Sequence, residues 1–382
     1  MTRSYDFIVI GSGTMGASTC WHLARSGQRV LGLDRHEVPH GFGSHHGHSR
    51  MIRLSYFEHS DYVPLLKRSY ELWGELESYT DQPILTRTGG LYMSPPDGVI
   101  VSGCVQASEE HGLAHEILGH DEICSEFPQF RLSENYRGFY EAAAGVLMVE
   151  PALQTVIDQT RRHGGEIRGG EEVLSWSVDG DSYRVQTQHG TYCSGGLVIT
   201  GGAWNDWLLR DLSIPLRVTR QTMFWLDQKD RLPSRFRQPP AWFIETEPGK
   251  GLYGIPPLPG QRGMKLADHC PGKTCDPDNV DRNCSEEDWR AFRSLAAHYF
   301  SQKLDVPLSM QTCLYTSTPD GHFLVDRHPL HSSLAIGAGF SGHGFKFAPV
   351  LGEILSQLVL QGKSAFAIDF LGLNRFQNET RS

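Results

Sequence analysis

A short apolar run followed by three spaced glycines constrains the fold of this chain more than any other feature. Residues 6–10 read DFIVI, a β-branched strand pattern, and GSGTMG follows at once at 11–16. Residues 17–27 place apolar side chains at helical spacing and end at a glycine. A second apolar run, RVLGLD at 29–34, closes on an acid. The sequence therefore predicts a βαβ unit of the Rossmann type.

The spacing of these glycines and of the acid is typical of a dinucleotide site. Gly11 permits a tight turn, Gly13 lets the backbone approach a pyrophosphate, and Gly16 allows the helix to pack closely on the strand. We expect the phosphates at the positive end of the helix and the ribose hydroxyls on Asp34. The alternative is an ordinary turn between a strand and a helix, with an exposed acid.

The strand, glycine and helix pattern returns at two distant places. Residues 195–209 read as a buried strand, a glycine pair and an amphipathic helix, and residues 333–362 as a strand, a glycine-rich turn and a long helix. Aromatic and β-branched runs at 89–95 and between about 216 and 310 indicate antiparallel strands instead. We predict an α/β fold with a discontinuous Rossmann-like domain, a second antiparallel-sheet domain, and a cleft between them.

Composition and charge exclude several classes of protein. The net charge of −9, without any Lys/Arg block, argues against a nucleic-acid partner. No stretch reaches the roughly 18 apolar residues that cross a bilayer, and the N-terminus does not look like a signal peptide. The eight cysteines form no CxxC pair, which suits a reducing compartment. We expect a cytoplasmic protein with neither a membrane nor a nucleic-acid partner.

The segment GSHHGHSR at 43–50 raises the question of a metal site. His45, His46 and His48 lie on a glycine-flanked stretch rather than four residues apart on a helix, and no acidic residue stands beside them. Cys270 and Cys275 likewise have no companion pair at zinc spacing. We therefore predict no metal site.

Six segments, spread over nearly the whole chain, form a specific combination. They are GSGTMG at 11–16, PHGFGSHHGHSRMIR at 39–53, YVPLLKRSYELW at 62–73, MKLADH at 264–269, CLYTSTPDGHFLVD at 313–326 and GFSGHGFKFAPVLGEILSQL at 339–358. Together these segments resemble the monomeric sarcosine oxidase family of amine-oxidising flavoproteins, which includes N-methyltryptophan oxidase. The resemblance implies FAD rather than NAD, attached covalently through Cys313. It also implies oxidation of a secondary amine by oxygen to an imine and hydrogen peroxide.

The resemblance assigns a role to each predicted domain. The FAD-binding domain would comprise residues 1–88, 145–215 and 311–382, and the substrate and catalytic domain residues 89–144 and 216–310. The residues expected to hold FAD are Gly11, Gly13, Gly16, Asp34, Ser44, His45, Arg50, Cys313, Gly342, Gly344 and Lys346.

Catalytic roles also follow from the resemblance. Arg50 is expected close to the flavin ring, where it is counted among the catalytic residues. Lys265 would activate oxygen through a fixed ammonium group, with a surface lysine as the alternative. His269 and Tyr315 would orient the amine or modulate its pKa, although His269 also fits a core histidine with its hydrogen bonds satisfied.

Three further residues are expected to bind the substrate. Arg53 and Lys346 would clamp its carboxylate, the arginine by bidentate hydrogen bonding and the lysine as a point charge. A solvated charge is the alternative for both. Tyr253 falls in the segment expected to cover the pocket.

The chain departs from the family pattern at three positions. His48 stands where an aspartate is usual and Ser49 where threonine is common. A neutral or cationic ring near Arg50 would make the flavin environment more positive. Gly321 stands in place of the glutamate of the usual Asp-Glu-His pattern, and the sequence offers no explanation for this change.

These features predict an FAD-dependent oxidase of N-methyl amino acids such as sarcosine, yielding the amino acid, formaldehyde and hydrogen peroxide. A larger pocket would instead admit N-methyl-L-tryptophan or a cyclic amine such as pipecolate. An NAD-dependent dehydrogenase would share the βαβ unit but need neither Cys313 nor Lys265, and a non-catalytic flavin-binding protein is a further alternative. The expected partners are the small amine and oxygen. We expect a monomer, since the chain has no sustained heptad.

Overall fold

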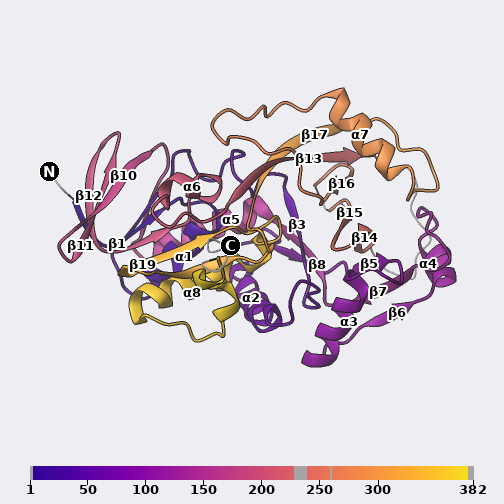
Figure 1. Ribbon diagram of the computed structural model, residues 1–382, viewed down its shortest axis with the longest axis horizontal. Coiled ribbons are helices and arrows are strands. Elements are labelled where there is room, and N and C mark those ends of the chain that lie inside the picture. The colour runs from indigo at the N-terminus through magenta and orange to yellow at the C-terminus, as the bar shows by residue number, and fades with distance from the viewer. Residues whose placement is uncertain (1–2, 228–238, 259, 377–382) are drawn as a thin grey trace.

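The βαβ unit expected from the N-terminal glycines forms the centre of a large sheet in the computed structural model, which describes residues 3–227, 239–258 and 260–376 (Figure 1). Parallel pairs join β1 to β2 and β12, β2 to β9, and β12 to β19. The three segments with the strand, glycine and helix pattern therefore meet in one sheet, as predicted. The strands of this first sheet are β1 (Arg3–Ile10), β2 (Val30–Leu33), β9 (Glu166–Arg168), β10 (Val173–Asp179), β11 (Ser182–Thr187), β12 (Gly190–Ile199), β18 (Leu324–His328) and β19 (His331–Ala338).

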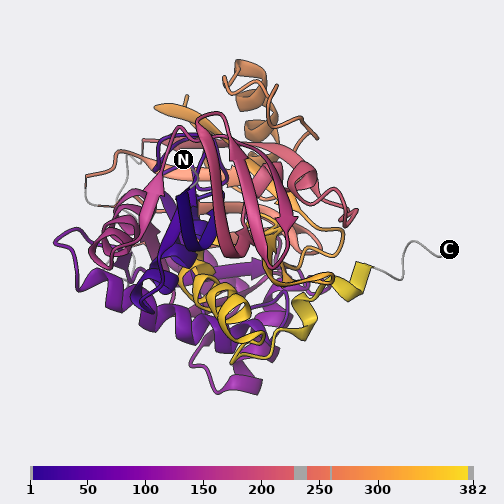
Figure 2. The same cartoon turned by 90° about the vertical axis from the view of Figure 1, so that its left-hand side faces the viewer.

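Helices cover one face of the first sheet (Figures 1 and 2). They are α1 (Thr14–Arg25), α2 (Tyr62–Glu77), α5 (Val149–Arg162) and α8 (Ala348–Gln361), and α1 and α2 each contact α5 and α8. Their apolar faces form the largest buried cluster of the protein with β1 and β12. α8 ends at Gly362, whose φ of 72° belongs to the left-handed region that terminates helices. On the opposite face of the parallel strands, apolar side chains of β1, β2, β12 and β19 pack with those of the β10–β11 hairpin, which continues the sheet beyond β12, and of the short α6 (Asn205–Leu208).

The second sheet runs in the order β17, β13, β16, β15, β14, β5, β7, β6. Its pairs are antiparallel, as predicted, except that β5 and β14 are parallel. β17 pairs with β13 along its length and so crosses the domain limit predicted at residue 311, although the limits themselves stay a prediction. The strands are β5 (Gly90–Ser94), β6 (Glu116–Leu118), β7 (Arg137–Glu141), β13 (Arg217–Leu226), β14 (Ala241–Glu247), β15 (Lys250–Ile255), β16 (Met264–Asp268) and β17 (Ser309–Ser317).

Three helices cover this second sheet. α7 (Glu286–Ala296) and α4 (His120–Glu126) bury apolar side chains on one part of it, and α3 (Ile100–His111) packs against β5 and β7. None of the helices in residues 3–227, 239–258 and 260–376 is long and apolar enough to span a bilayer.

A small third sheet connects the two large ones. It consists of β3 (Ser49–Ile52), β4 (Leu85–Thr86) and β8 (Gly145–Met148). β3 contacts β15 of the second sheet and the 3-10 turn η2 (Phe345–Phe347), which leads into α8. The histidine-rich segment that precedes β3 is thereby placed between the two large sheets. Further 3-10 turns are η1 (Gly202–Trp204), η3 (Asp369–Leu371) and η4 (Leu373–Phe376).

Candidate active site

The turn between β1 and α1 leaves no room for a side chain at Gly11 or at Gly16. Gly11 has a φ of 86°, and a Cβ atom there would lie 2.6 Å from the carbonyl oxygen of Thr200. A Cβ atom at Gly16 would lie 1.9 Å from the carbonyl oxygen of Gly11. The helix can therefore begin this close to the strand only with glycine at both positions. Gly16 serves that packing, whereas Gly11 and Gly13 line a pocket in front of the turn.

The pocket in front of the turn has unpaired polar atoms in its walls. Thr14 Oγ1, His45 Nε2 and Thr316 Oγ1 are buried without a hydrogen-bond partner in the described structure. Burial lowers the pKa of His45 to about 3, so its ring is neutral. Together with the positive end of α1, these atoms suit the phosphates of a dinucleotide. Other lining residues include Asp34, Ser44, Arg50, Trp204, Tyr315, Gly342 and Gly344.

The Asp34 carboxylate is held in place at this pocket. One of its oxygens accepts from the backbone N–H of Ser12 at 2.9 Å, and the other from that of His36 at 3.0 Å. His40 Nε2 lies 3.3 Å from the latter oxygen. The acceptor expected to bind the ribose is thus oriented by the backbone at the end of β2.

The histidine-rich segment positions Arg50. The guanidinium of Arg50 donates to the carbonyl oxygens of Ser44, His46 and Ser49 at 2.7 to 2.8 Å. His46 bonds the carbonyl oxygen of Thr312 on β17 through Nδ1 at 2.9 Å, which ties the segment to the second sheet. In the described part of the chain, no three His, Cys, Asp or Glu side chains gather so as to hold a metal. The segment is therefore a support that fixes a positive charge.

Lys265 is buried on β16 behind this segment. Its Nζ donates to the carbonyl oxygens of Gly47 and Ser49 at 2.9 and 3.0 Å, the two residues that flank His48. His48 adopts a left-handed φ of 63° and bonds Glu150 at 2.7 Å through Nδ1. Burial, with the nearby charge of Arg50, holds the pKa of Lys265 well below its usual range.

A second pocket continues from the first. Arg50, Tyr315, Gly342 and Phe345 line both, so the two pockets meet at these residues. Gly342 is required there, because its φ is 80° and a Cβ atom would lie 2.3 Å from the Tyr315 ring. The second pocket is further lined by Met51, Arg53, Phe57, Glu58, Tyr92, Met223, Phe243, Tyr253, Ile255, His269, Cys313, His343 and Lys346. Lys265 is not among the residues that line either pocket in the described structure.

Cys313 lies on β17, two residues before Tyr315, which lines both pockets. It is buried in an apolar cluster with Met223 and Ala267 and lines the second pocket. Burial raises the pKa of its thiol, although the charges of Arg50 and Lys265 act in the opposite direction. The two cations therefore reduce the rise in pKa without reversing it.

His269 and two tyrosines form one wall of the second pocket. His269 Nδ1 lies 3.2 Å from the Tyr315 hydroxyl, and its ring meets that of Tyr253 edge to face. Burial lowers the pKa of His269 to about 4 and raises the pKa values of Tyr253 and Tyr315. All three side chains are consequently neutral near pH 7 and offer hydrogen bonds rather than charge.

Arg53, which is buried, and the partly buried Glu58 form an ion pair in the lining of the second pocket. Arg53 donates to both Glu58 oxygens at 2.7 Å and to the carbonyl oxygen of Ser55. Its guanidinium lies 4.0 Å from the centre of the Tyr56 ring and 4.6 Å from that of Phe57. Burial raises the pKa of Glu58, but the charges around it, that of Arg53 first, and the hydrogen bonds from Arg53 together leave the pKa below its usual range.

Lys346 stands beside this pair, at the end of the glycine-rich turn. Its backbone carbonyl accepts from Trp73 Nε1 of α2 at 2.9 Å, and its Nζ donates to the His343 carbonyl oxygen at 2.8 Å. Burial lowers the pKa of Lys346 to about 7, an effect that Arg53 increases and Glu58 opposes. Lys346 thus changes its charge near neutral pH.

Three polar residues that contact Arg53 or Lys346, directly or through one another, were not predicted from the sequence. Glu58 pairs with Arg53, Tyr56 bonds Lys346 at 3.4 Å, and His343 bonds Tyr56 at 2.5 Å. Glu58 follows Arg53 by five residues, and His343 stands in the same turn as Lys346. This closeness along the chain was the signal available in the sequence, and it does not show which side chains contact one another.

Comparison with known proteins identifies this arrangement. The model of the FAD dependent oxidoreductase family matches residues 6–358. A monomeric sarcosine oxidase of Streptomyces avermitilis is 39% identical over 374 residues, 96% of this chain and 97% of the relative. An N-methyl-L-tryptophan oxidase of Salmonella dublin is 32% identical over 97% of this chain and 99% of its own length. The solved structure of NikD, described as an unusual amino acid oxidase, superposes with a TM-score of 0.83 at 25% identity, covering 97% of this chain and 98% of that chain.

The glycine turn and the pocket in front of it define a flavin-dependent enzyme, and the chain belongs to the FAD dependent oxidoreductase family. Within that family it is a flavin-dependent amine oxidase of the sarcosine and N-methyl amino acid oxidase type. The residues present fit FAD: the glycine turn and the unpaired Thr14 and His45 atoms suit the pyrophosphate, and Asp34 suits the ribose.

Proposed function

We propose that this enzyme oxidises small N-methyl amino acids, with sarcosine as the type substrate. The overall reaction consumes the amine, oxygen and water, and yields the amino acid, formaldehyde and hydrogen peroxide. The observation that carries the proposal is the second pocket, whose lining combines the charged Arg53 and Lys346 with the neutral His269 and Tyr315. Such a pocket complements an amino acid whose nitrogen reacts as the neutral amine.

Charged residues would hold the carboxylate of the substrate. Lys346 has one ammonium proton beyond those directed at His343 and Tyr56, and a carboxylate can accept it. Arg53 is already paired with Glu58, so it offers charge and any unshared N–H group rather than a free bidentate fork. On this geometry Lys346 is the principal anchor and Arg53 the secondary one.

The residues that line the pocket would also determine the protonation state in which the amine binds. Arg50, Arg53 and Lys346 place positive charge around a buried pocket, which disfavours a further ammonium group. His269 and Tyr315 can accept a hydrogen bond from, or donate one to, the substrate nitrogen without adding charge. FAD, when bound, accepts the two electrons and the hydrogen removed from the carbon beside that nitrogen.

We further propose that FAD is attached through Cys313. This cysteine lines the substrate pocket two residues before Tyr315, which lines both pockets, and the charges of Arg50 and Lys265 oppose the rise that burial causes in its thiol pKa. Protein precipitated with acid and washed should stay yellow, whereas Cys313→Ser should release its flavin. A Cys313→Ser protein that stays yellow would refute the attachment site, and Cys275→Ser, which alters a thiol outside both pockets, is the matched control.

A bulkier substrate is the second candidate. Met51, Phe57, Tyr92 and Phe243 give the second pocket an aromatic and apolar wall, and the Salmonella dublin relative is an N-methyl-L-tryptophan oxidase. Anaerobic bleaching of the flavin by sarcosine, N-methyl-L-tryptophan and L-pipecolate distinguishes the candidates. Fastest bleaching by sarcosine supports the small pocket. Fastest bleaching by one of the larger amines would replace sarcosine by that amine.

A further inference from the structure

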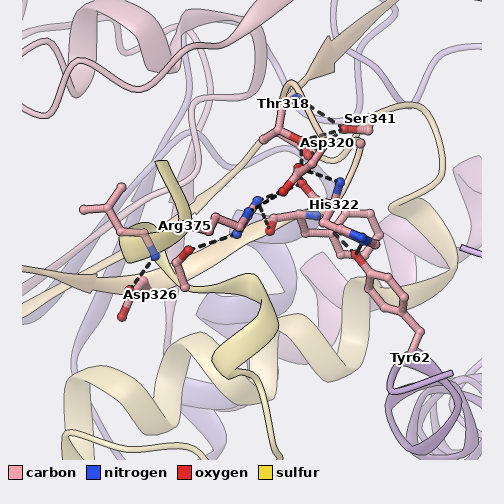
Figure 3. A network of polar contacts seen from close by, with 12 residues as sticks. Tyr62, Thr318, Asp320, His322, Asp326, Ser341 and Arg375 are labelled. Atoms are coloured by element: carbon pink, nitrogen blue, oxygen red, sulfur yellow. Dashed lines mark hydrogen bonds and ion pairs between the residues drawn. The ribbon is translucent and has the colours of Figure 1, made fainter. Parts of the chain in front are cut away.

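The C-terminal turn η4 packs against the turn that follows β17 (Figure 3). Arg375 makes this contact. Its Nε donates to Asp320 Oδ2 at 2.8 Å, and one Nη donates to the carbonyl oxygens of His322 and Phe323 at 3.0 and 2.7 Å. Leu373 adds a backbone hydrogen bond to Asp326 at 2.8 Å. Residues 373–375 are thus fixed to residues 320–326 by charged and backbone groups together.

The turn held by Arg375 has further contacts: the Thr318 carbonyl oxygen accepts from the Gly321 backbone N–H at 3.3 Å, and the Tyr62 hydroxyl bonds the His322 ring and the Phe323 backbone N–H. Asp320 uses its second oxygen to accept from the His322 backbone N–H at 3.0 Å, and Thr318 donates to the His322 carbonyl oxygen at 2.6 Å. Gly321, at the tip, has a φ of 77° and no neighbouring atoms around its Cβ position. Its carbonyl oxygen lies 3.0 Å from His343 Nε2. Asp320, which Arg375 holds, therefore helps to position that carbonyl together with Thr318 and Tyr62.

The Gly321 carbonyl sets the tautomer of His343. A carbonyl oxygen only accepts, so His343 Nε2 must carry the proton. Burial lowers the pKa of His343 to about 3, so the ring is neutral and its Nδ1 must be an acceptor. The Tyr56 hydroxyl, 2.5 Å from Nδ1, is then the donor. Its oxygen lone pairs remain available to Lys346 Nζ at 3.4 Å.

This series of hydrogen bonds ends at Lys346, the proposed anchor of the substrate carboxylate. Lys346 directs one proton to the His343 carbonyl oxygen at 2.8 Å and one towards Tyr56. The remaining proton is left for the second pocket, which Lys346 lines. A flip of His343 to the other tautomer would turn the Tyr56 proton towards Lys346 and remove one of its acceptors.

We propose that Arg375 is a positioning residue for substrate binding: it fixes the turn at 318–322, whose Gly321 carbonyl holds His343 and Tyr56 in the orientation that aims Lys346 at the substrate carboxylate. The proposal rests on the role of Lys346 in the proposed function. It assigns to the C-terminal segment a part in substrate affinity, although Arg375 lines neither pocket in the described structure.

Binding of acetate to the holoenzyme, measured by calorimetry, tests the proposal without turnover. Arg375→Gln should raise the Kd of acetate about three- to tenfold and raise the KM of the amine equally, with kcat within about twofold of the wild type. Arg375→Lys, which keeps the charge, should recover part of the loss. Arg29→Gln is the control, since Arg29 also pairs with an aspartate, Asp6, but outside both pockets.

A double-mutant cycle separates positioning from general loosening of the fold. In a Lys346→Met background, Arg375→Gln should change the Kd of acetate by less than twofold, because the group that it positions is gone. Equal effects in both backgrounds, or an unchanged Kd in Arg375→Gln alone, would overturn the proposal. If Lys346→Met binds acetate as tightly as the wild type, the clamp itself is wrong. Asp320→Asn provides the same test should Arg375→Gln fail to fold.

Discussion

The charge of Lys346 makes carboxylate binding depend on pH in a way that can be calculated in advance. The pKa of Lys346 is lowered to about 7 by burial, so the free enzyme carries the ammonium below pH 7 and loses it above. A bound carboxylate stabilises the ammonium and raises that pKa. Affinity should therefore be highest near pH 6 and fall by up to about tenfold per pH unit above pH 7.

No other group in this pocket with a resolved pKa shift accounts for such a change. The pKa of Glu58 lies below its usual range, and burial lowers those of His269 and His343 to about 4 and about 3. Arg53 keeps its charge throughout, and burial raises the pKa values of the lining tyrosines. Among the pocket groups whose pKa is clearly shifted, Lys346 is thus the one that changes its charge between pH 6 and 9.

The magnitude follows from one charge-assisted hydrogen bond, worth roughly 1.5 to 3 kcal/mol. The Kd of acetate should accordingly be about ten- to one hundredfold higher at pH 9 than at pH 6. Calorimetry on the holoenzyme measures it, and acetate has no amine to complicate the titration. Lys346→Arg should bind acetate with little pH dependence, and Lys346→Met weakly at every pH. A flat wild-type profile, or an unchanged slope in Lys346→Met, would refute the reasoning.

Two further predictions concern oxygen and the glycine turn. Lys265→Met should slow reoxidation of the reduced flavin about a hundredfold or more while slowing its reduction by substrate less than tenfold, because the amino group held by the Gly47 and Ser49 carbonyls, and the positive charge that it carries when protonated, are lost; stopped-flow absorbance measures both, and equal slowing contradicts the assignment. Gly16→Ala should lose flavin and destabilise the fold by roughly 1 to 3 kcal/mol, since its Cβ would lie 1.9 Å from the Gly11 carbonyl oxygen. The control is Gly74→Ala, in α2 with open space around the Cβ position, which should be neutral or stabilising by up to about 1 kcal/mol in thermal melts. A Gly16→Ala protein with full flavin content would contradict the steric account.

The parts of the fold that the sequence predicted are those governed by local rules. Gly11 and Gly16 were recognisable because a βα turn of this kind excludes Cβ atoms, and the glycine that ends α8 has the left-handed φ that such positions need. The parallel pairing of β5 with β14 was not predictable in this way. Alternation of apolar residues indicates a strand but not the direction of its neighbour, which more distant parts of the chain decide.

The same distinction applies to the candidate site: residues in recognisable segments were predicted, whereas contacts that depend on folding were not. Residues such as Lys346 and His269 were expected because they stand in segments that resemble a known family, and the structure brings both into the second pocket. Glu58 was missed because an acid five residues after Arg53 looks like any exposed charge until the chain folds the two together. Arg375 lies at the other end of the chain from Arg53, and no periodicity links them.

We propose that this enzyme oxidises a small secondary amine at the expense of oxygen. The measurement to make is the stoichiometry of oxygen consumed, hydrogen peroxide released and formaldehyde formed by the purified holoenzyme with sarcosine, beside glycine and L-proline. We expect equal amounts of all three with sarcosine and little or none with glycine. Oxygen consumption without formaldehyde, or a yellow protein that consumes no oxygen with sarcosine or a larger N-methyl amino acid, would contradict it.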